Sequence, residues 1–185
     1  QDAVMQQYRK FYPERIIGFN WLPNTTKYAY LSGDRATLYT SSPSTKKEEV
    51  LLNKKELNEI LGTDLWGFYP IEFTSENIFI MNDGASFYEV NIKERTGKTL
   101  HSIEGSFSSP LFEPFSKKLA YLIENNVMLR DANNNTVAIT KNEDPNIVSG
   151  QAIARSEFGI TGGLFWSPKG NYLAFYQKDE SYVHD

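Results

Sequence analysis

Residues 166–175 read Trp-Ser-Pro-Lys-Gly-Asn-Tyr-Leu-Ala-Phe. Pro168 fixes φ for a turn, and Lys169 and Gly170 are residues of the kind that complete it. The apolar run that follows has the composition of a β-strand, and it carries the small Ala174 between larger side chains. The stretch therefore predicts a tight turn followed by a strand that packs closely against a neighbouring sheet.

The same order of residues occurs earlier in the chain. Trp21-Leu22-Pro23 precedes Lys27–Tyr30, and Phe112-Glu113-Pro114 precedes Lys118–Tyr121, with an alanine six positions after each proline. A degenerate copy runs from Phe73-Thr74-Ser75 to Ile78–Met81, so that successive copies lie 52, 39 and 54 residues apart. A β-propeller blade takes about 40–50 residues. The period predicts blades, and the alternative is strand-turn-strand units of another β fold.

Each of the first three copies continues into a further strand with alternating apolar and polar residues, at 36–40, 86–91 and 126–131. One helix interrupts the strands. Asn53-Lys54-Lys55-Glu56 has the pattern of a helix start, three apolar residues follow at helical spacing, and Gly62 is a helix-ending residue. The prediction is an all-β chain of about four blades, each a four-stranded antiparallel sheet, with one short surface helix.

Composition excludes several classes of function. The chain has 185 residues, of which 40% are hydrophobic and 14% aromatic, and a net charge of -4 without a basic stripe for nucleic acid. No apolar run is long enough for a membrane span, and the absence of cysteine removes thiol nucleophiles and thiolate metal sites. No Gly-x-Ser-x-Gly elbow occurs, and we expect His101 and His184 to be ordinary surface histidines. We therefore expect no catalytic residue, metal or cofactor in this chain.

Between the strand at 137–140 and Phe165 lie residues with weak periodicity. Long connections of this kind in compact domains tend to be functional. Their central part, Gln151–Phe158, has a composition compatible with about two helical turns. On the residues alone, we expect Glu157 within it to be a solvated glutamate paired with Arg155 or a lysine.

The stretch 157–185, which reads EFGITGGLFWSPKGNYLAFYQKDESYVHD, closely resembles the β-propeller of dipeptidyl peptidase IV and its bacterial relatives, including the prolyl tripeptidyl peptidases. The resemblance implies that residues 1–185 are the N-terminal portion of an eight-bladed propeller, about half of the ring. It also implies that the catalytic α/β-hydrolase domain is absent from this chain. The substrate-binding residues that it implies are Arg155, Ser156, Glu157 and Phe158, and it assigns to the Glu157 carboxylate the binding of a peptide ammonium group.

Two positions depart from the family pattern. Dipeptidyl peptidase IV carries two consecutive glutamates, whereas Ser156 precedes Glu157 here, which is more similar to the prolyl tripeptidyl peptidases. The substrate-binding arginine of an earlier blade would fall near Asn82, where no arginine occurs. Both changes leave open whether dipeptides or tripeptides are released.

The resemblance implies a substrate-gating, amine-binding part of a periplasmic or secreted serine exopeptidase that releases Xaa-Pro di- or tripeptides, inactive by itself. Its expected partners are the N-terminus of a peptide and the missing catalytic domain, with no nucleic acid and no membrane span. Half a ring leaves apolar blade faces exposed, which favours pairing with a second copy as a homodimer. The alternative function is a non-enzymatic periplasmic propeller module for protein interaction.

Overall fold

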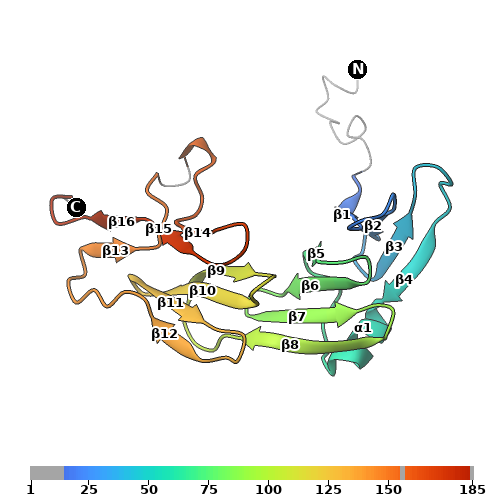
Figure 1. Ribbon diagram of the computed structural model, residues 1–185, viewed down its shortest axis with the longest axis horizontal. Helices are drawn as coiled ribbons and strands as arrows, with labels where there is room; N and C mark the ends of the chain where they lie inside the picture. Colours follow the sequence, from blue (N-terminus) through green and yellow to red (C-terminus); the bar gives the residue numbers. More distant parts are fainter. Residues whose placement is uncertain (1–14, 155–156, 184–185) are drawn as a thin grey trace, which may run out of the picture. The chain divides into compact units, whose positions relative to one another are not determined.

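The computed structural model describes residues 15–154 and 157–183. The chain folds into two compact units. The first ends at Met81 and takes in Val90–Thr96, and the second takes in Asn82–Glu89 and the chain from Gly97 onward. Each unit is built from short β-strands, in agreement with the aromatic and β-branched runs of the sequence (Figure 1).

Three four-stranded antiparallel sheets follow one another along the chain, each with its strands in sequence order. The first sheet contains β1 (Ile17–Trp21), β2 (Tyr28–Leu31), β3 (Thr37–Ser41) and β4 (Glu49–Asn53). The second contains β5 (Ile71–Phe73), β6 (Ile78–Asn82), β7 (Ser86–Asn91) and β8 (Thr96–Ser102). The third contains β9 (Ser108–Glu113), β10 (Lys118–Ile123), β11 (Asn126–Arg130) and β12 (Thr136–Ala138). These sheets confirm the first three predicted sheets.

The predicted helix is confirmed as α1 (Lys54–Leu61), with the caps that its sequence indicates. The Asn53 side chain accepts a hydrogen bond from the Glu56 amide at 3.0 Å, and the Glu56 carboxylate accepts one from the Asn53 amide at 3.0 Å. Gly62 ends the helix in the left-handed conformation. The apolar face of the helix places Leu57 in the core of the first unit, where it is fully buried.

The fourth copy of the repeat differs from the other three. Its strands form two separate two-stranded ladders, β14 (Leu164–Trp166) with β15 (Leu173–Phe175) and β13 (Ile147–Ser149) with β16 (Gln177–Asp179). The prediction of four-stranded sheets throughout is therefore wrong for this copy. The described residues of this copy form one antiparallel hairpin, whose first side is interrupted by the long connection between β13 and β14, and they contain no further strand.

The prediction that the alanine of each repeat packs closely is confirmed for two of the three alanines. Ala29 and Ala120 are fully buried. In the second unit Ala120 lies in a cluster with Leu122, Val127 and Leu164, against which the apolar residues of β14 and β15 pack. Ala174 is exposed, because it lies on the other face of the β14–β15 hairpin, beside the 43% exposed Phe165.

A buried carboxylate joins two turns of the second unit. Glu113 is only 3% exposed, and it accepts hydrogen bonds from the Phe115 amide at 3.2 Å and from the amide and hydroxyl of Ser116, both at 2.6 Å. Its carboxylate also packs against Gly170. Burial opposes ionisation of Glu113, but the hydrogen bonds from Ser116 and Phe115 outweigh it and hold the pKa of this carboxyl below its ordinary value of 4.5.

We expect Glu113 to make folding sensitive to acid. A carboxyl whose pKa is depressed in the folded state contributes stability above the unfolded pKa, and this contribution is lost as the pH falls through the folded value. Glu113→Gln should therefore lower the free energy of unfolding by about 1–2 kcal/mol at pH 7 and make it less dependent on pH below 4.5. Urea unfolding between pH 7 and pH 3 measures both effects. Identical pH profiles for the two proteins would contradict this assignment.

Candidate functional site

The long connection between β13 and β14 is an insertion into one strand of a hairpin. Ser149 pairs with Gln177, and Leu164 pairs with Phe175. The whole segment 150–163 is therefore inserted opposite a single residue of the other strand, Tyr176. The Tyr176 amide donates to the Gly163 carbonyl at 3.0 Å, and the Gly150 amide donates to the Tyr176 carbonyl at 2.7 Å. Both ends of the connection are therefore bound to the same residue, and its described residues 151–154 and 157–162 project from the hairpin as a loop (Figure 1).

The two ends of this 151–162 loop touch each other through their backbones. A Cβ atom placed on Gly163 would lie 2.2 Å from the Gln151 carbonyl oxygen and 2.6 Å from that of Gly150. Only glycine permits such an approach. We call Gly150, Gln151, Gly163 and Tyr176 the loop base.

The loop base is tied to the third sheet. Ser149, which is fully buried, accepts hydrogen bonds from the side chains of Asn142 and Gln177, each at 3.0 Å, and its amide donates to the Asn125 carbonyl at 3.0 Å. After the loop, the Trp166 indole donates to the Leu111 carbonyl at 3.1 Å. The ends of the loop are thus fixed, whereas Glu157 and Phe158 within it are exposed.

Glu157 lies in this loop, in a single 3-10 turn, Glu157–Gly159. Its amide donates to the Ala154 carbonyl at 2.6 Å, and its carbonyl accepts from the Ile160 amide at 2.9 Å. The prediction of about two helical turns over Gln151–Phe158 is wrong, because none of residues 151–154 is helical and Phe158 has a φ of 55°, which ends any helix. Arg155 and Ser156 lie outside the described residues.

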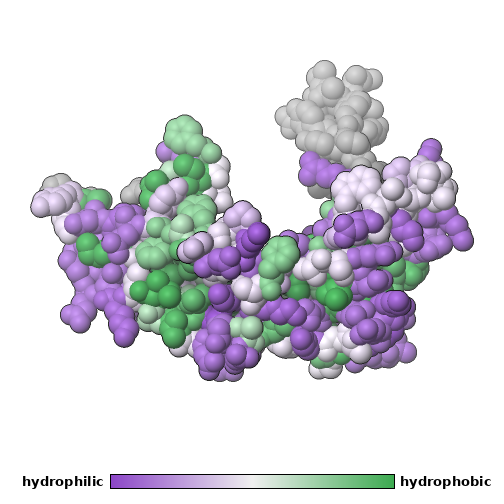
Figure 2. All heavy atoms as spheres, viewed as in Figure 1, coloured by the Kyte–Doolittle hydropathy of each residue, from purple (hydrophilic) through white to green (hydrophobic). Residues whose placement is uncertain are grey.

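The described part of the loop presents one carboxylate beside apolar side chains. Glu157 is exposed, and its carboxylate has no hydrogen bond or ion pair with any other described residue. Phe158 is 94% exposed and Ile153 is 53% exposed. Figure 2 shows apolar surface on this loop above strands β14 and β15. A carboxylate next to an exposed ring is a suitable surface for an ammonium group with a short apolar neighbour.

The position where the family arginine was expected has a structural role. The Asn82 side chain accepts a hydrogen bond from the Gly84 amide at 2.7 Å, and Asp83 accepts from the Ala85 and Ser86 amides at 3.0 and 2.7 Å. These bonds close the turn between β6 and β7. Another arginine, Arg130, also has structural contacts: it donates a hydrogen bond to the Ser102 carbonyl at 2.6 Å, and its guanidinium lies over the Tyr121 ring.

The prediction of a surface histidine at position 101 is wrong. His101 is 1% exposed, its Nε2 donates to the Lys117 carbonyl at 2.8 Å, and its Nδ1 lies 2.9 Å from Asn134 Oδ1. Its ring also meets the edge of Phe112. The histidine therefore joins β8 to two turns of the third sheet. His184 lies outside the described residues.

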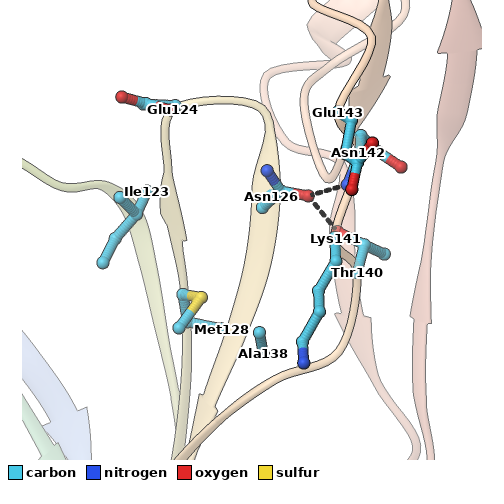
Figure 3. Close-up of a pocket in the computed structure, with 9 residues that line it drawn as sticks. All are labelled: Ile123, Glu124, Asn126, Met128, Ala138, Thr140, Lys141, Asn142 and Glu143. Atoms are coloured by element: carbon cyan, nitrogen blue, oxygen red, sulfur yellow. Dashed lines mark hydrogen bonds between the residues drawn. The ribbon is translucent and has the colours of Figure 1, made fainter.

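A second feature is a shallow hollow of about 330 Å³ at the end of β10–β12. Apolar Ile123, Met128 and Ala138 line it together with charged side chains (Figure 3). The Asn126 side-chain oxygen accepts hydrogen bonds from the Thr140 hydroxyl at 3.0 Å and the Asn142 amide at 2.7 Å. Because this acceptor is already used by the connection after β12, we assign the hollow a structural role.

Comparison of this chain with known proteins finds a matching family model and similar solved structures. The family model described as the dipeptidyl peptidase IV N-terminal region matches residues 70–185. A putative dipeptidyl aminopeptidase IV of Bacteroides ovatus is 30% identical with a TM-score of 0.76, over 94% of this chain and 24% of that protein. Dipeptidyl peptidase 4 of Porphyromonas gingivalis is 20% identical with a TM-score of 0.66, over 96% of this chain and 27% of that protein. The chain thus spans about a quarter of the length of each.

Proposed function

Because this chain belongs to the family of dipeptidyl peptidase IV N-terminal regions, we propose that it holds the N-terminus of a peptide substrate for a serine exopeptidase. The peptidase releases Xaa-Pro di- or tripeptides, and the catalytic triad lies in an α/β-hydrolase domain elsewhere in the polypeptide. The four repeats form half of an eight-bladed propeller. The protein works in the periplasm or outside the cell, and within the described residues no helix has the length and apolar character for a membrane crossing.

The observation that carries this proposal is the position of Glu157. Its carboxylate lies on a projecting loop, exposed, while both ends of that loop are bound to Tyr176. A peptide ammonium is the complementary ligand, because it carries a full charge and three donors. Holding the ammonium at a fixed point also selects the bond that is cleaved, since only a peptide bond a set number of residues from the N-terminus then reaches the catalytic serine.

Phe158 completes the proposed site. Its ring is almost fully exposed next to Glu157, and it can pack against the first side chain of the peptide. Arg155 and Ser156 are the remaining members of the proposed substrate-binding set, by resemblance to the family. A single glutamate, with Ser156 before it and no arginine at Asn82, is compatible with release of either dipeptides or tripeptides.

The test is Glu157→Gln in the full-length protein. Loss of the negative charge removes a charge-assisted hydrogen bond worth about 1.5–3 kcal/mol, so kcat/KM for free-amine Ala-Ala-Pro and Gly-Pro amides should fall about 10- to 100-fold. The matched control is Glu143→Gln, which makes the same charge change at an exposed residue after β12. This control should remain within about twofold of the parent protein.

Two results would count against the proposal. One is a Glu157→Gln protein whose kcat/KM for free-amine substrates stays within about twofold of the parent value. The other is a full-length sequence with further propeller repeats and no Gly-x-Ser-x-Gly elbow. The second result would favour a non-enzymatic protein-interaction module.

A further inference from the structure

We propose that the loop base is a positioning device, in which the close backbone contact at Gly163 sets the place of Glu157 and thereby the length of the released peptide. This inference rests on the proposed function of Glu157. It concerns residues that do not touch the substrate. They act through the 151–162 loop.

The first argument is the number of constraints at the loop base. Tyr176 bonds to both ends of the loop, at 3.0 Å to Gly163 and 2.7 Å to Gly150. Its ring also meets the Phe165 ring edge-on, with centroids 5.1 Å apart. One residue therefore fixes where the loop leaves the hairpin and where it returns.

The second argument is that the loop base rests on the core. A Cβ atom on Gly150 would lie 2.4 Å from Leu122 and 3.0 Å from Leu164 and Val127, so the backbone there is in direct contact with the buried cluster of the second unit. Gln151 adds a side-chain hydrogen bond to Asn125 at 3.4 Å. The base cannot move without moving the core.

The third argument is that, among the described residues, Glu157 has hydrogen bonds only within the loop itself. The hydrogen bonds of its own backbone go to Ala154 and Ile160, which belong to the same loop. The loop base is therefore the part of the described loop that is held by the rest of the fold, and in this proposal it sets the direction in which the loop carries the carboxylate. A shift of the loop base therefore moves the Glu157 carboxylate, and the carboxylate in turn moves the bound N-terminus of the peptide.

Gly163→Ala is the perturbation that the geometry offers. Its new Cβ would meet the Gln151 carbonyl oxygen at 2.2 Å, so the two ends of the loop must separate. The adjacent Gly162→Ala is the matched control, because a Cβ there has no neighbour within 4 Å. Both changes add one methyl group to neighbouring glycines of the same chain.

The experiment is a double-mutant cycle in the full-length protein, with Gly163→Ala made in the parent and in the Glu157→Gln background. Steady-state kinetics on free-amine peptides gives kcat/KM, and mass spectrometry gives the ratio of dipeptide to tripeptide released. We expect Gly163→Ala to lower kcat/KM at least tenfold in the parent and less than threefold in the Glu157→Gln background, where the carboxylate to be positioned is already gone. We also expect it to change the product ratio, while Gly162→Ala changes neither quantity.

The possible outcomes separate the two proposals. An equal loss from Gly163→Ala in both backgrounds, with an unchanged product ratio, would show that Gly163 only supports the fold, and would overturn this inference while leaving the role of Glu157 intact. A Glu157→Gln protein of normal activity would instead overturn the proposed function, and this inference with it. If Gly163→Ala does not fold, a single glycine inserted after Gly162 lengthens the loop without a new Cβ and is judged by the same two criteria.

Discussion

Replacing Phe79 by alanine is expected to lower the free energy of unfolding by about 3–5 kcal/mol. Phe79 on β6 is fully buried, and its ring lies 5.6 Å from Phe73 and 6.3 Å from Phe68, centroid to centroid. Truncation removes the ring from this aromatic cluster and leaves a cavity that the two remaining rings cannot fill without leaving their own packing. Urea unfolding of the chain, followed by tryptophan fluorescence, measures the loss.

The control for this prediction is Phe115→Ala. The Phe115 side chain is 79% exposed, so the same truncation removes little buried surface and should change the free energy of unfolding by less than about 0.5 kcal/mol. Similar losses from the two variants would mean that the cluster around Phe79 is not part of the stable core of the first unit.

Gly170→Ala is expected to lower the free energy of unfolding by about 2–4 kcal/mol, from two separate causes. Gly170 has a φ of 64°, a conformation that costs an alanine about 1 kcal/mol. In addition, its Cβ atom would lie 2.1 Å from Glu113 Oε2. The buried carboxylate must then move away from the Phe115 and Ser116 amides, and the loss of these charge-assisted hydrogen bonds adds to the cost.

Gly62→Ala separates the two causes. Gly62 has nearly the same φ, 66°, but a Cβ there has no neighbour within 4 Å. This variant should therefore show only the backbone cost, about 1 kcal/mol. The difference between the two variants, measured by thermal unfolding at pH 7, reports the contact with Glu113. Equal losses at both positions would rule out a stabilising role for that contact.

The parts of the fold that depend on local sequence could be predicted from it. The strands after Pro23 and Pro114 were found where the turn residues and the apolar pattern placed them. The helix was found between its Asn53 and Gly62 caps. In each case the determining residues lie within a few positions of the element that they specify, so tertiary context did not override them.

The parts that depend on contacts between distant residues could not be predicted. The burial of His101 depends on polar partners on Lys117 and Asn134, which only the folded third sheet brings to it. The segment Gln151–Phe158 has a composition compatible with a helix, but the loop that contains it is flanked by Gly150 and Gly163, which both hydrogen-bond to Tyr176, and Phe158 has a positive φ. No pattern in the sequence links Gly163 to Tyr176. The prediction of Glu157 came from family resemblance, and its role awaits experiment.

The divided strand has a consequence for how such proteins can change over evolutionary time. Because β13 and β14 meet end to end at Tyr176, the hairpin that they form with β15 and β16 is complete without the residues between them. Segments of other lengths and sequences can in principle be exchanged at this junction without altering strand register. The sequence of the projecting segment and the strand register of the scaffold are thus encoded in separable stretches of the gene, and a library of grafted segments could vary one without changing the other.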